Sequence, residues 1–280
     1  MRMKRNRAWL YFLAPSLIGV TVFVFLPFAD VVRRSFLTAM SKEFTGFGNY
    51  RTVFTNSAFL LAVKNTLRFT VTGIPLLVAA GLLIALVLSG SKHVRLIKSL
   101  YLFPLAVPTA VIAIVWKMIF YKHGFLNLIC VSLCRTFQPV DYLGTGAAFY
   151  VLTGTYLWKN LGYTIVLWLA GIAGVNDEIL EAAKVDGAGW RQRLFLVLLP
   201  NLKGSLYTIV VLSFLNSFKI YREAYLTAGS YPDESMYLLQ HLFNNWFVNL
   251  ELDKMAAAAV VCAAFFLVFI LLLQRLWDRE

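Results

Sequence analysis

The chain has 280 residues, of which 60% are hydrophobic and only 14% charged, with a net charge of +12 and a mean hydropathy of +0.71. A soluble domain of this composition would lack the polar side chains needed to cover its surface, so the values exclude an ordinary soluble protein and predict a membrane protein. The positive charge suits contact with anionic lipid, and the absence of a basic stripe interleaved with aromatics makes nucleic acid a poor alternative partner.

Six apolar stretches are long enough to cross a bilayer, which takes about 20 residues each. They cover about residues 9–29, 66–89, 98–120, 150–174, 203–221 and 256–276. The first stretch follows a basic start, but it is too long for a cleaved signal peptide and lacks a small-residue cleavage site before Asp30. We therefore expect an all-α, polytopic membrane helix bundle with six transmembrane helices, forming a single transmembrane domain over residues 1–280.

The distribution of Lys and Arg predicts the orientation of these spans. With a cytoplasmic N-terminus, half of the 26 basic residues fall in short inner segments. These are Arg2, Lys4, Arg5, Arg7, Lys92, Arg95, Lys98, Lys184, Arg191, Arg193, Lys203, Arg275 and Arg279. Because short cytoplasmic loops are enriched in Lys and Arg, we expect both termini in the cytoplasm.

Prolines interrupt the second and third spans, at Pro75, Pro104 and Pro108. Each removes a backbone hydrogen bond, and such a break survives in a membrane only where neighbouring helices or a wet cavity satisfy the freed carbonyl. The prolines are consistent with helices that line a cavity and equally with ordinary kinks in a packed bundle.

After the third span, His123, Cys130 and Cys134 could be imagined as metal ligands, but their apolar neighbours favour ordinary packing. The only other cysteine, Cys262, lies in the last span, so three cysteines make no disulfide framework. We expect no bound metal, no cofactor and no catalytic residue.

The fourth span contains Lys159 and Asn160, where an ionisable group is costly unless it faces protein or water. Lys159 either snorkels to the outer interface along its four-carbon stem or lines a substrate cavity. Tyr156, Trp158 and Tyr163 could stack on sugar rings or belong to the aromatic belt at the membrane interface.

A polar segment at residues 176–201 follows the fourth span and has the pattern of a helix, a turn and a second helix. Asn176 or Asp177 can cap the first helix, Gly187 and Gly189 allow the bend that ends it, and Pro200 closes or kinks the second helix. The segment contains Glu181-Ala182-Ala183, then Asp186-Gly187-Ala188, then Phe195 and the ending Leu198-Leu199-Pro200. This pattern closely resembles the cytoplasmic signature loop of ABC-importer permeases, with Leu198 where the pattern favours Ile.

The resemblance implies a fold, a role and a set of partners. The fold would be that of type I importer permeases (MetI-like), and the loop 176–201 would be a coupling loop that docks into a groove of a separate ATPase. The residues that match the motif are Glu181, Ala182, Ala183, Asp186, Gly187 and Ala188. The partners implied are a second permease subunit, two ATP-binding subunits and an extracellular solute-binding protein, assembled in a bacterial inner membrane.

A second segment narrows the resemblance. Gly46-Phe47-Gly48-Asn49-Tyr50, followed by Lys64-Asn65-Thr66-Leu67, is similar to the segment before the second span in sugar-importer permeases of the carbohydrate-uptake class, the maltose and glycerol-phosphate type. The resemblance covers nearly the whole chain and implies a sugar or oligosaccharide as substrate.

The fifth span carries a second polar cluster, Asn216, Ser217 and Lys219, which could meet the hydroxyls of a sugar or hold helices together. The residues that follow, 221–246, are expected to form an outer loop with a short amphipathic helix, which would contact the solute-binding protein or rest on the membrane surface.

No Gly-Lys dipeptide occurs in the chain, so a Walker A phosphate loop is excluded and the ATPase must be a separate subunit. The expected function is that of a permease forming half of the pathway of an ATP-driven sugar importer. A secondary carrier or channel for a small polar solute stays open, as does a scaffold that only anchors an ATPase.

Overall fold

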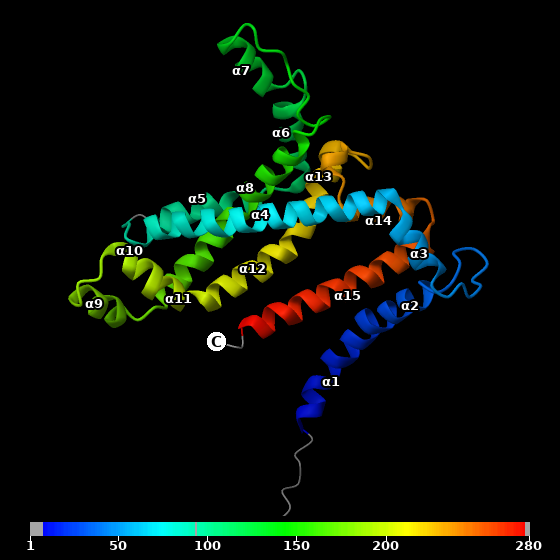
Figure 1. The fold of residues 1–280 in the computed structure, drawn as a ribbon, viewed down its shortest axis with the longest axis horizontal. Coiled ribbons are helices and arrows are strands. Elements are labelled where there is room, and N and C mark those ends of the chain that lie inside the picture. The colour runs from blue at the N-terminus through cyan, green and yellow to red at the C-terminus, as the bar shows by residue number, and fades with distance from the viewer. Residues whose placement is uncertain (1–7, 93, 278–280) are drawn as a thin grey trace, which may run out of the picture. The chain divides into compact units, whose positions relative to one another are not determined.

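The computed structural model describes residues 8–92 and 94–277. Within that part of the chain the regular structure is helical, and the only β-type pairing is an isolated antiparallel bridge between Leu37 and Phe44 (Figure 1). The all-α prediction is confirmed. The basic residues Arg2 to Arg7 and Arg279, used to predict the orientation, lie outside the described residues.

The described residues form two compact units, one from the residues up to Leu60 together with those from Leu242 onward, and the other from the residues Leu61 to His241. In the first, α1 (Ala8–Val20), a π-helical turn (Thr21–Phe25) and α2 (Leu26–Arg34) follow one another directly. The π turn lies one helical turn before Pro27, whose ring would clash with the Phe23 carbonyl in a regular α-helix. The widened turn therefore lets one apolar helix continue past a proline.

The first unit also contains α3 (Gly48–Thr55), most of α14 (Leu239–Val248) and α15 (Leu252–Trp277), and α15 packs against α2 and α3. Between α2 and α3, the Asn49 amide donates hydrogen bonds to the carbonyls of Ser35 (2.9 Å) and Leu37 (2.8 Å). A buried amide thus fixes the turn at Gly46 and Phe47 and the start of α3.

The second unit consists mainly of long helices joined by short turns. They are α4 (Ser57–Ser89), α5 (Val94–Ala106), α6 (Thr109–Phe120), α7 (Phe125–Leu133), α8 (Ala148–Ala173), α12 (Lys203–Ser217) and α13 (Tyr221–Ala228). Between α8 and α12 lie α9 (Asp177–Val185), α10 (Trp190–Gln192), a π-helical turn (Arg193–Leu198) and α11 (Leu199–Asn201). A 3-10 turn (Phe218–Ile220) joins α12 to α13, a second one covers Glu234–Met236, and α14 (Leu239–Val248) follows.

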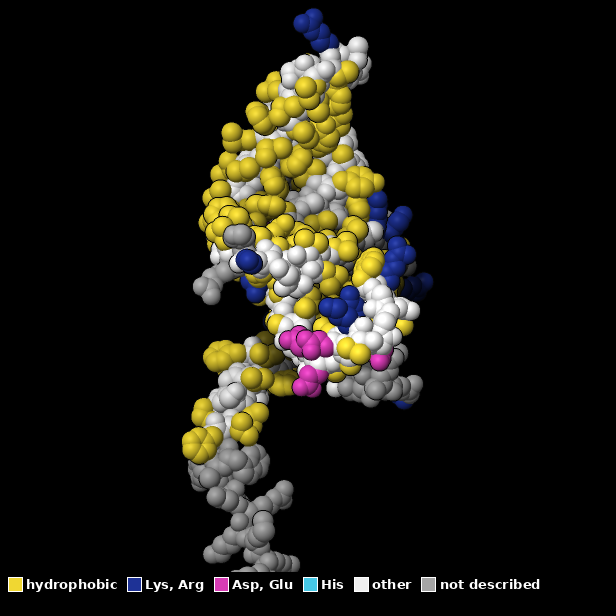
Figure 2. Space-filling view, turned by 90° about the vertical axis from the view of Figure 1, so that its left-hand side faces the viewer, with side chains coloured by type: hydrophobic (Ala, Val, Ile, Leu, Met, Phe, Trp, Pro, Cys, Tyr) yellow, Lys and Arg dark blue, Asp and Glu magenta, His cyan; other side chains and the backbone are white. Residues whose placement is uncertain are grey.

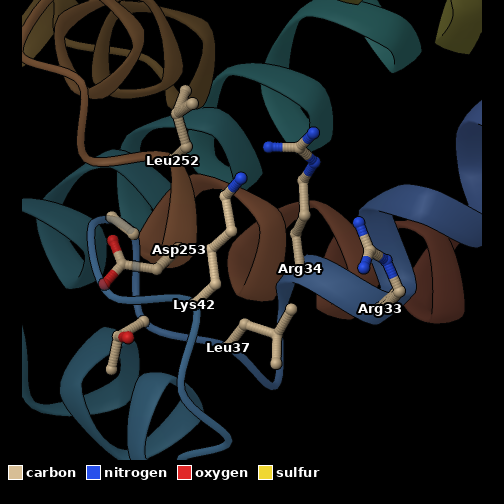
Figure 3. A pocket seen from close by; sticks show the side chains of 8 residues that line it. Arg33, Arg34, Leu37, Lys42, Leu252 and Asp253 are labelled. Carbon is tan, nitrogen blue, oxygen red and sulfur yellow. The ribbon is translucent and has the colours of Figure 1, made fainter.

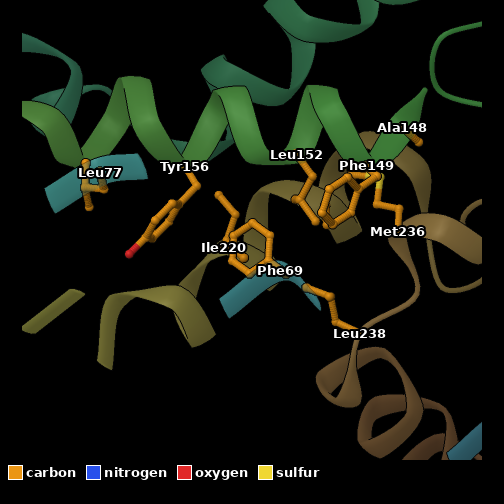
Figure 4. Close-up of a cluster of buried hydrophobic side chains, with 10 residues drawn as sticks. Phe69, Leu77, Ala148, Phe149, Leu152, Tyr156, Ile220, Met236 and Leu238 are labelled. Carbon is orange, nitrogen blue, oxygen red and sulfur yellow. The ribbon is translucent and has the colours of Figure 1, made fainter. Parts of the chain in front are cut away.

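Helix α8 is the centre of this unit. Its buried residues Leu152 and Tyr156 pack with Phe69 of α4 and Ile220 in one core cluster (Figure 4). A second cluster joins Trp168 of α8 to buried residues of α4 and α12. Gly162 of α8 lies directly against the backbone carbonyl of Tyr101 in α5, so the two helices cross at a glycine, as small residues allow in membrane bundles.

The third predicted span, 98–120, is two helices and not one. Helix α5 ends at Ala106 and α6 begins at Thr109, because Pro108 disfavours the helical conformation at Val107 and itself takes an extended conformation (φ −58°, ψ 137°) as the N-cap of α6. At Pro104 the chain does not break, since α5 continues through it to Ala106.

Four helical stretches among the described residues are long and apolar enough to cross a membrane. They are Phe12–Arg34, which runs from α1 into α2, Ser57–Ser89, Thr109–Leu133, which combines α6 and α7, and Leu252–Arg275. Trp190–Asn201 with Lys203–Ala228 make a fifth if this pair, bent by 65°, is one span. Helix α8 is long enough to cross a membrane but is less apolar than these stretches, and α5 is too short to cross one by itself. The count of six spans and their boundaries remain predictions.

Hydrophobic side chains also cover much of the molecular surface, as a membrane-embedded protein requires. Figure 2 shows them over most of one face, on which the few acidic side chains in view lie close together. Outward-facing examples include Phe23 and Leu267 in the first unit and Leu83 and Val87 in the second. In water such a surface would be an aggregation hazard, whereas in a bilayer it faces lipid.

Candidate functional site

Helix α9 begins at a side-chain cap. The Oδ1 atom of Asn176 accepts a hydrogen bond from the Glu178 N–H at 3.0 Å, so Asn176 is the cap and not Asp177. Asp177 and Glu178 lie in the first turn, where negative charge complements the positive end of the helix dipole. These two features explain how nine residues form a helix on an exposed loop.

The same helix ends in a Schellman motif centred on Gly187. The N–H of Ala188 donates to the Ala183 carbonyl at 2.9 Å, and the N–H of Gly187 donates to the Lys184 carbonyl at 3.2 Å. Gly187 has φ of +80°, and a Cβ atom there would meet nothing within 4 Å, so only the backbone conformation demands glycine. Gly189 has an ordinary extended conformation (φ −63°, ψ 167°), so the structure assigns the bend to Gly187 alone.

The six residues that match the permease motif therefore lie together on α9 and its C-terminal turn. Glu181, Ala182, Asp186 and Gly187 are exposed, and Ala183 and Ala188 are partly buried. Leu180 holds the helix against the unit by packing on the Trp168 cluster, whereas Val185 leaves 87% of its surface exposed. A capped helix with an outward apolar side chain is typical of a docking element.

The second half of the loop, residues 189–201, is a helical segment that bends where it joins α12. Gln192 Oε1 accepts a hydrogen bond from the Gly189 N–H at 2.8 Å and starts α10. The π turn then precedes Pro200 as the other π turn precedes Pro27, and Leu202 leaves the helical conformation (φ −89°, ψ 4°). The result is a 65° bend between this segment and α12, and it falls at Leu202, just after the short helix that contains Pro200.

A cavity of about 480 Å³ lies where α5, α8, α12 and α13 approach one another, and its volume is in the range of small-molecule sites. Four of the five predicted pathway residues line it, namely Lys159, Asn160, Asn216 and Lys219. The other lining residues are Leu105, Tyr163, Leu212, Ile220 and Glu223. The structure thus brings polar groups of the fourth and fifth predicted spans to one place.

Lys159 does not snorkel, because it forms an ion pair with Glu223. The Lys159 ammonium donates to Glu223 Oε1, and the Thr109 hydroxyl at the start of α6 donates to the same oxygen at 3.3 Å. The side chains of Lys159 and Glu223 are 21% and 3% exposed. A buried charge requires such a partner, so the pair neutralises both groups inside the unit.

Lys219 and Asn216 interact with each other across one turn of helix. The Lys219 ammonium donates to Asn216 Oδ1 at 2.8 Å. Ser217 does not line the cavity, since it is buried and its hydroxyl donates to the Phe214 carbonyl at 2.6 Å. The helix turns its side chain into the packed core, away from Asn216 and Lys219.

The three aromatic residues of α8 have different surroundings. Tyr156 is fully buried and its hydroxyl donates to the Ser213 carbonyl at 2.8 Å, so it belongs to the core and not to an interfacial belt. Trp158 packs on Trp116 with ring centroids 5.4 Å apart. Tyr163 alone lines the cavity, with its hydroxyl 3.0 Å from Ser213 Oγ.

Sequence reasoning missed Glu223, which it placed in an outer loop. The signal available was Lys159 itself, because a lysine in an apolar span needs a counter-charge. Nothing in the spacing selects Glu223, which lies 64 residues further along the chain.

A smaller pocket in the first unit is lined by Arg33, Arg34 and Lys42 with Asp253, and Figure 3 shows these side chains. Arg33 and Arg34 both bond to Asp30, which compensates part of their charge. Within residues 8–92 and 94–277, no group of three or more His, Cys, Asp or Glu side chains could hold a metal ion. His123, Cys130 and Cys134 accordingly form no such group.

Broken apolar helices around a polar cavity, together with an exposed, capped helix and turn, define a permease-type membrane transport subunit. Residues 77–279 match the family of binding-protein-dependent transport system inner membrane components. The chain belongs to this family, which confirms the resemblance in the loop 176–201. It is accordingly a multi-pass transporter subunit and not an enzyme.

Individual relatives agree with this assignment over most of their length. The diacetylchitobiose uptake system permease protein of Streptomyces coelicolor is 30% identical, with 93% of this chain and 79% of the relative covered. The trehalose/maltose transport system permease protein of Thermococcus litoralis is also 30% identical, with 78% and 76% covered. The crystal structure of a bacterial ABC transporter that imports the acidic polysaccharide alginate has a chain with a TM-score of 0.79 and 20% identity, covering 98% of this chain and 96% of that chain. This likeness confirms the fold class.

Proposed function

We propose that this permease forms half of the translocation pathway of an ATP-driven importer for a sugar or oligosaccharide. The support is that relatives over most of the chain are named for diacetylchitobiose, trehalose or maltose, and arabinooligosaccharide transport. The single structural observation that carries the proposal is the cavity that gathers Lys159, Asn160, Asn216 and Lys219, because a sugar needs several hydrogen-bonding groups in one place.

Energy enters through the coupling loop. In this proposal α9 docks into a groove on a separate ATP-binding subunit through Glu181, Ala182 and Val185, which face outward. The loop continues through the kink at Leu202 directly into α12, which carries Asn216. A movement of α9 is therefore passed to the wall of the cavity, and ATP shifts the balance between two states by binding one of them more tightly.

The partners follow from this arrangement. One chain supplies one coupling loop and one side of a pathway, so the complete importer contains a second permease subunit and two ATP-binding subunits. Both termini and the coupling loop lie in the cytoplasm of a bacterial cell, and the solute-binding protein acts on the opposite side. The outer loop that would meet it is held in shape by Asn65, whose amide donates to the carbonyls of Glu234 and Tyr237.

Reconstitution tests the proposal. Proteoliposomes that contain both permeases, the ATP-binding subunits and the binding protein should accumulate labelled oligosaccharide only when ATP is enclosed with the ATPase sites. A Walker A lysine variant of the ATPase should abolish uptake. Uptake that persists with the dead ATPase would favour a carrier or channel, and ATP hydrolysis without any sugar flux would favour a scaffold.

A further inference from the structure

The charges that line the cavity do not cancel. Lys159 and Glu223 neutralise each other in their buried pair. Lys219 is a second ammonium on the same cavity, and its acceptor is the neutral Asn216 Oδ1. Among the residues that the structure describes, Lys219 forms no ion pair, so the cavity wall carries one positive charge in excess.

A neutral sugar is a poor match for this wall. When a ligand fills the cavity, it displaces water that solvates the Lys219 ammonium, and a hydrogen bond to a sugar hydroxyl offsets only part of the lost solvation free energy. A carboxylate or phosphate oxygen offsets more of it, because a hydrogen bond between two charged groups is about twice as strong as one between neutral groups. Lysine suits such an anion as a compact point charge on a flexible stem.

Asn216 strengthens the preference for an anion. Lysine can only donate, so the contact at 2.8 Å fixes Oδ1 of Asn216 as the acceptor and turns its NH₂ group away from Lys219. Lys219 and Asn216, one helical turn apart on the same edge of the cavity, thus offer one charged and one neutral donor, while the carboxylate of Glu223 is occupied by Lys159 and Thr109.

We propose that this edge binds the acidic group of an anionic carbohydrate, either the carboxylate of a uronate or the phosphate of a phosphorylated sugar. The inference rests on the proposed import of sugars and names the class of sugar. Lys219 is the charge-selective contact, Asn216 is its neighbour in the same site, and the Lys159–Glu223 pair holds the wall on which they lie.

The experiment uses the purified pair of permeases with the ATP-binding subunits in nanodiscs, without ATP and without binding protein, so that the permeases alone select the ligand. Two matched pairs of probes are titrated: trigalacturonate against its methyl ester, and glucose 6-phosphate against glucose. The expected result is that at least one acidic probe binds about tenfold or more tightly than its neutral partner, because only the acidic probe makes a charged hydrogen bond. The pair of probes whose acidic member binds more tightly shows whether the bound group is a carboxylate or a phosphate.

Variants of Lys219 distinguish a contribution of its charge to binding from a contribution of its size and shape. Lys219→Gln should weaken binding of the preferred acidic probe about tenfold and leave its neutral partner unchanged, whereas Lys219→Arg should retain most of the preference. Arg222→Gln is the matched control, because Arg222 is an exposed cation three residues further on that does not line the cavity. It should change neither affinity.

The inference is overturned if no acidic probe binds more tightly than its neutral partner, or if Lys219→Gln weakens both members of a pair equally. Failure of the proposed function looks different, because then no carbohydrate of either charge stimulates ATP hydrolysis or enters proteoliposomes of the complete importer. If the complete importer takes up neutral sugars with no preference for acidic ones, the proposed import of sugars stands, and only the inferred preference for anionic carbohydrates is refuted.

Discussion

Gly187 is the residue whose conformation matters most for the coupling loop. Its φ of +80° lies in the region that costs a residue with a Cβ atom about 1–2 kcal/mol, and a β-branched residue more. Gly187→Val should therefore open the Schellman turn and loosen the end of α9, where Ala183 and Ala188 are bonded. The protein should still insert and assemble, but sugar-stimulated ATP hydrolysis in the reconstituted complex should fall severalfold.

Asn is the matched control at this position, because its side chain tolerates the left-handed conformation. Gly187→Asn adds more side-chain atoms than alanine would, yet it should retain most of the stimulated hydrolysis, since a Cβ atom meets nothing within 4 Å. Unimpaired stimulation in Gly187→Val would refute the role of this turn, and equal losses in both variants would assign the effect to bulk and not to conformation.

The ion pair between Lys159 and Glu223 makes a second prediction at this scale. Lys159→Met leaves a carboxylate that is 3% exposed without its partner, and breaking a buried pair in this way costs about 3–5 kcal/mol. The detergent-solubilised complex should show a clearly lower unfolding temperature. The double variant Lys159→Met with Glu223→Gln should recover much of the loss, because no buried charge is then left alone.

A surface pair in the same chain provides the comparison. Lys254 and Glu251 lie 3.0 Å apart with side chains 30% and 36% exposed, so Lys254→Met should cost less than about 1 kcal/mol. A double variant that is no more stable than Lys159→Met alone would show that the two buried groups do not act as a pair.

Residue by residue, the sequence predicted local features better than partners. The cap and the turn of α9 follow from residue type and place at a helix end, so the sequence limited the cap to Asn176 or Asp177 and the bend to Gly187 and Gly189, from which the structure selects Asn176 and Gly187. The bond from Lys159 to Glu223 depends on how two helices distant in sequence approach, and the burial of Ser217 depends on the rotation of α12. Neither is encoded in local spacing.

At the scale of helices, the crossing of α5 and α8 depends on one glycine. A Cβ atom on Gly162 would overlap the backbone carbonyl of Tyr101, which cannot move without moving α5. Gly162→Ala should therefore push the two helices apart and destabilise the complex by about 1–3 kcal/mol, as overpacking does. Because Lys159 and Leu105 lie on these helices, uptake should also fall.

Gly154 supplies the matched substitution, since it lies in the same helix and a Cβ atom there meets nothing within 4 Å. Gly154→Ala should raise stability slightly, because alanine is the better helix former by about 0.5–1 kcal/mol. The comparison is made by thermal unfolding of the detergent-solubilised complex. Equal effects of the two substitutions would show that close packing at Gly162 is unimportant.

Prolines illustrate how far helical elements could be predicted. Pro108 ends one helix and Pro200 bends another, whereas α5 runs through Pro104, α4 through Pro75, and π turns precede Pro27 and Pro200. A proline weakens a helix at a known place, but the neighbouring helices decide whether the chain breaks, bends or widens there. The sequence therefore located the weak points and could not state the outcome at each.

For the whole molecule, the orientation in the membrane is predicted from the distribution of Lys and Arg alone. Composition was enough to predict an all-helical membrane protein, and the motif in the loop 176–201 was enough to predict the family. Neither determines which side of the membrane that loop occupies. The docking of α9 on an ATPase depends on that side.

Two thiol positions, one predicted on each side of the membrane, test the orientation. The native Cys134 is exposed and falls in a predicted outer segment, and Val185 is 87% exposed on the predicted cytoplasmic loop. In an otherwise cysteine-free chain, Cys134 should react with an impermeant maleimide in intact cells, whereas the Val185→Cys variant should react only after permeabilisation. The Thr136 hydroxyl and the backbone N–H groups of Thr136 and Phe137 hold the pKa of the Cys134 thiol below its usual value, so more of it is the reactive thiolate at neutral pH.

That pKa also gives the test its own control. A lowered pKa keeps the thiolate present at a lower pH. As the pH falls, the labelling rate of Cys134 should therefore decline at a lower pH than the labelling rate of the introduced thiol in permeabilised Val185→Cys cells. Thr136→Val should slow the labelling of Cys134 without changing its sidedness, since it removes a hydrogen bond and no charge. If intact cells instead label the introduced thiol and protect Cys134, the orientation is inverted, and α9 lies on the side of the membrane that no ATPase can reach.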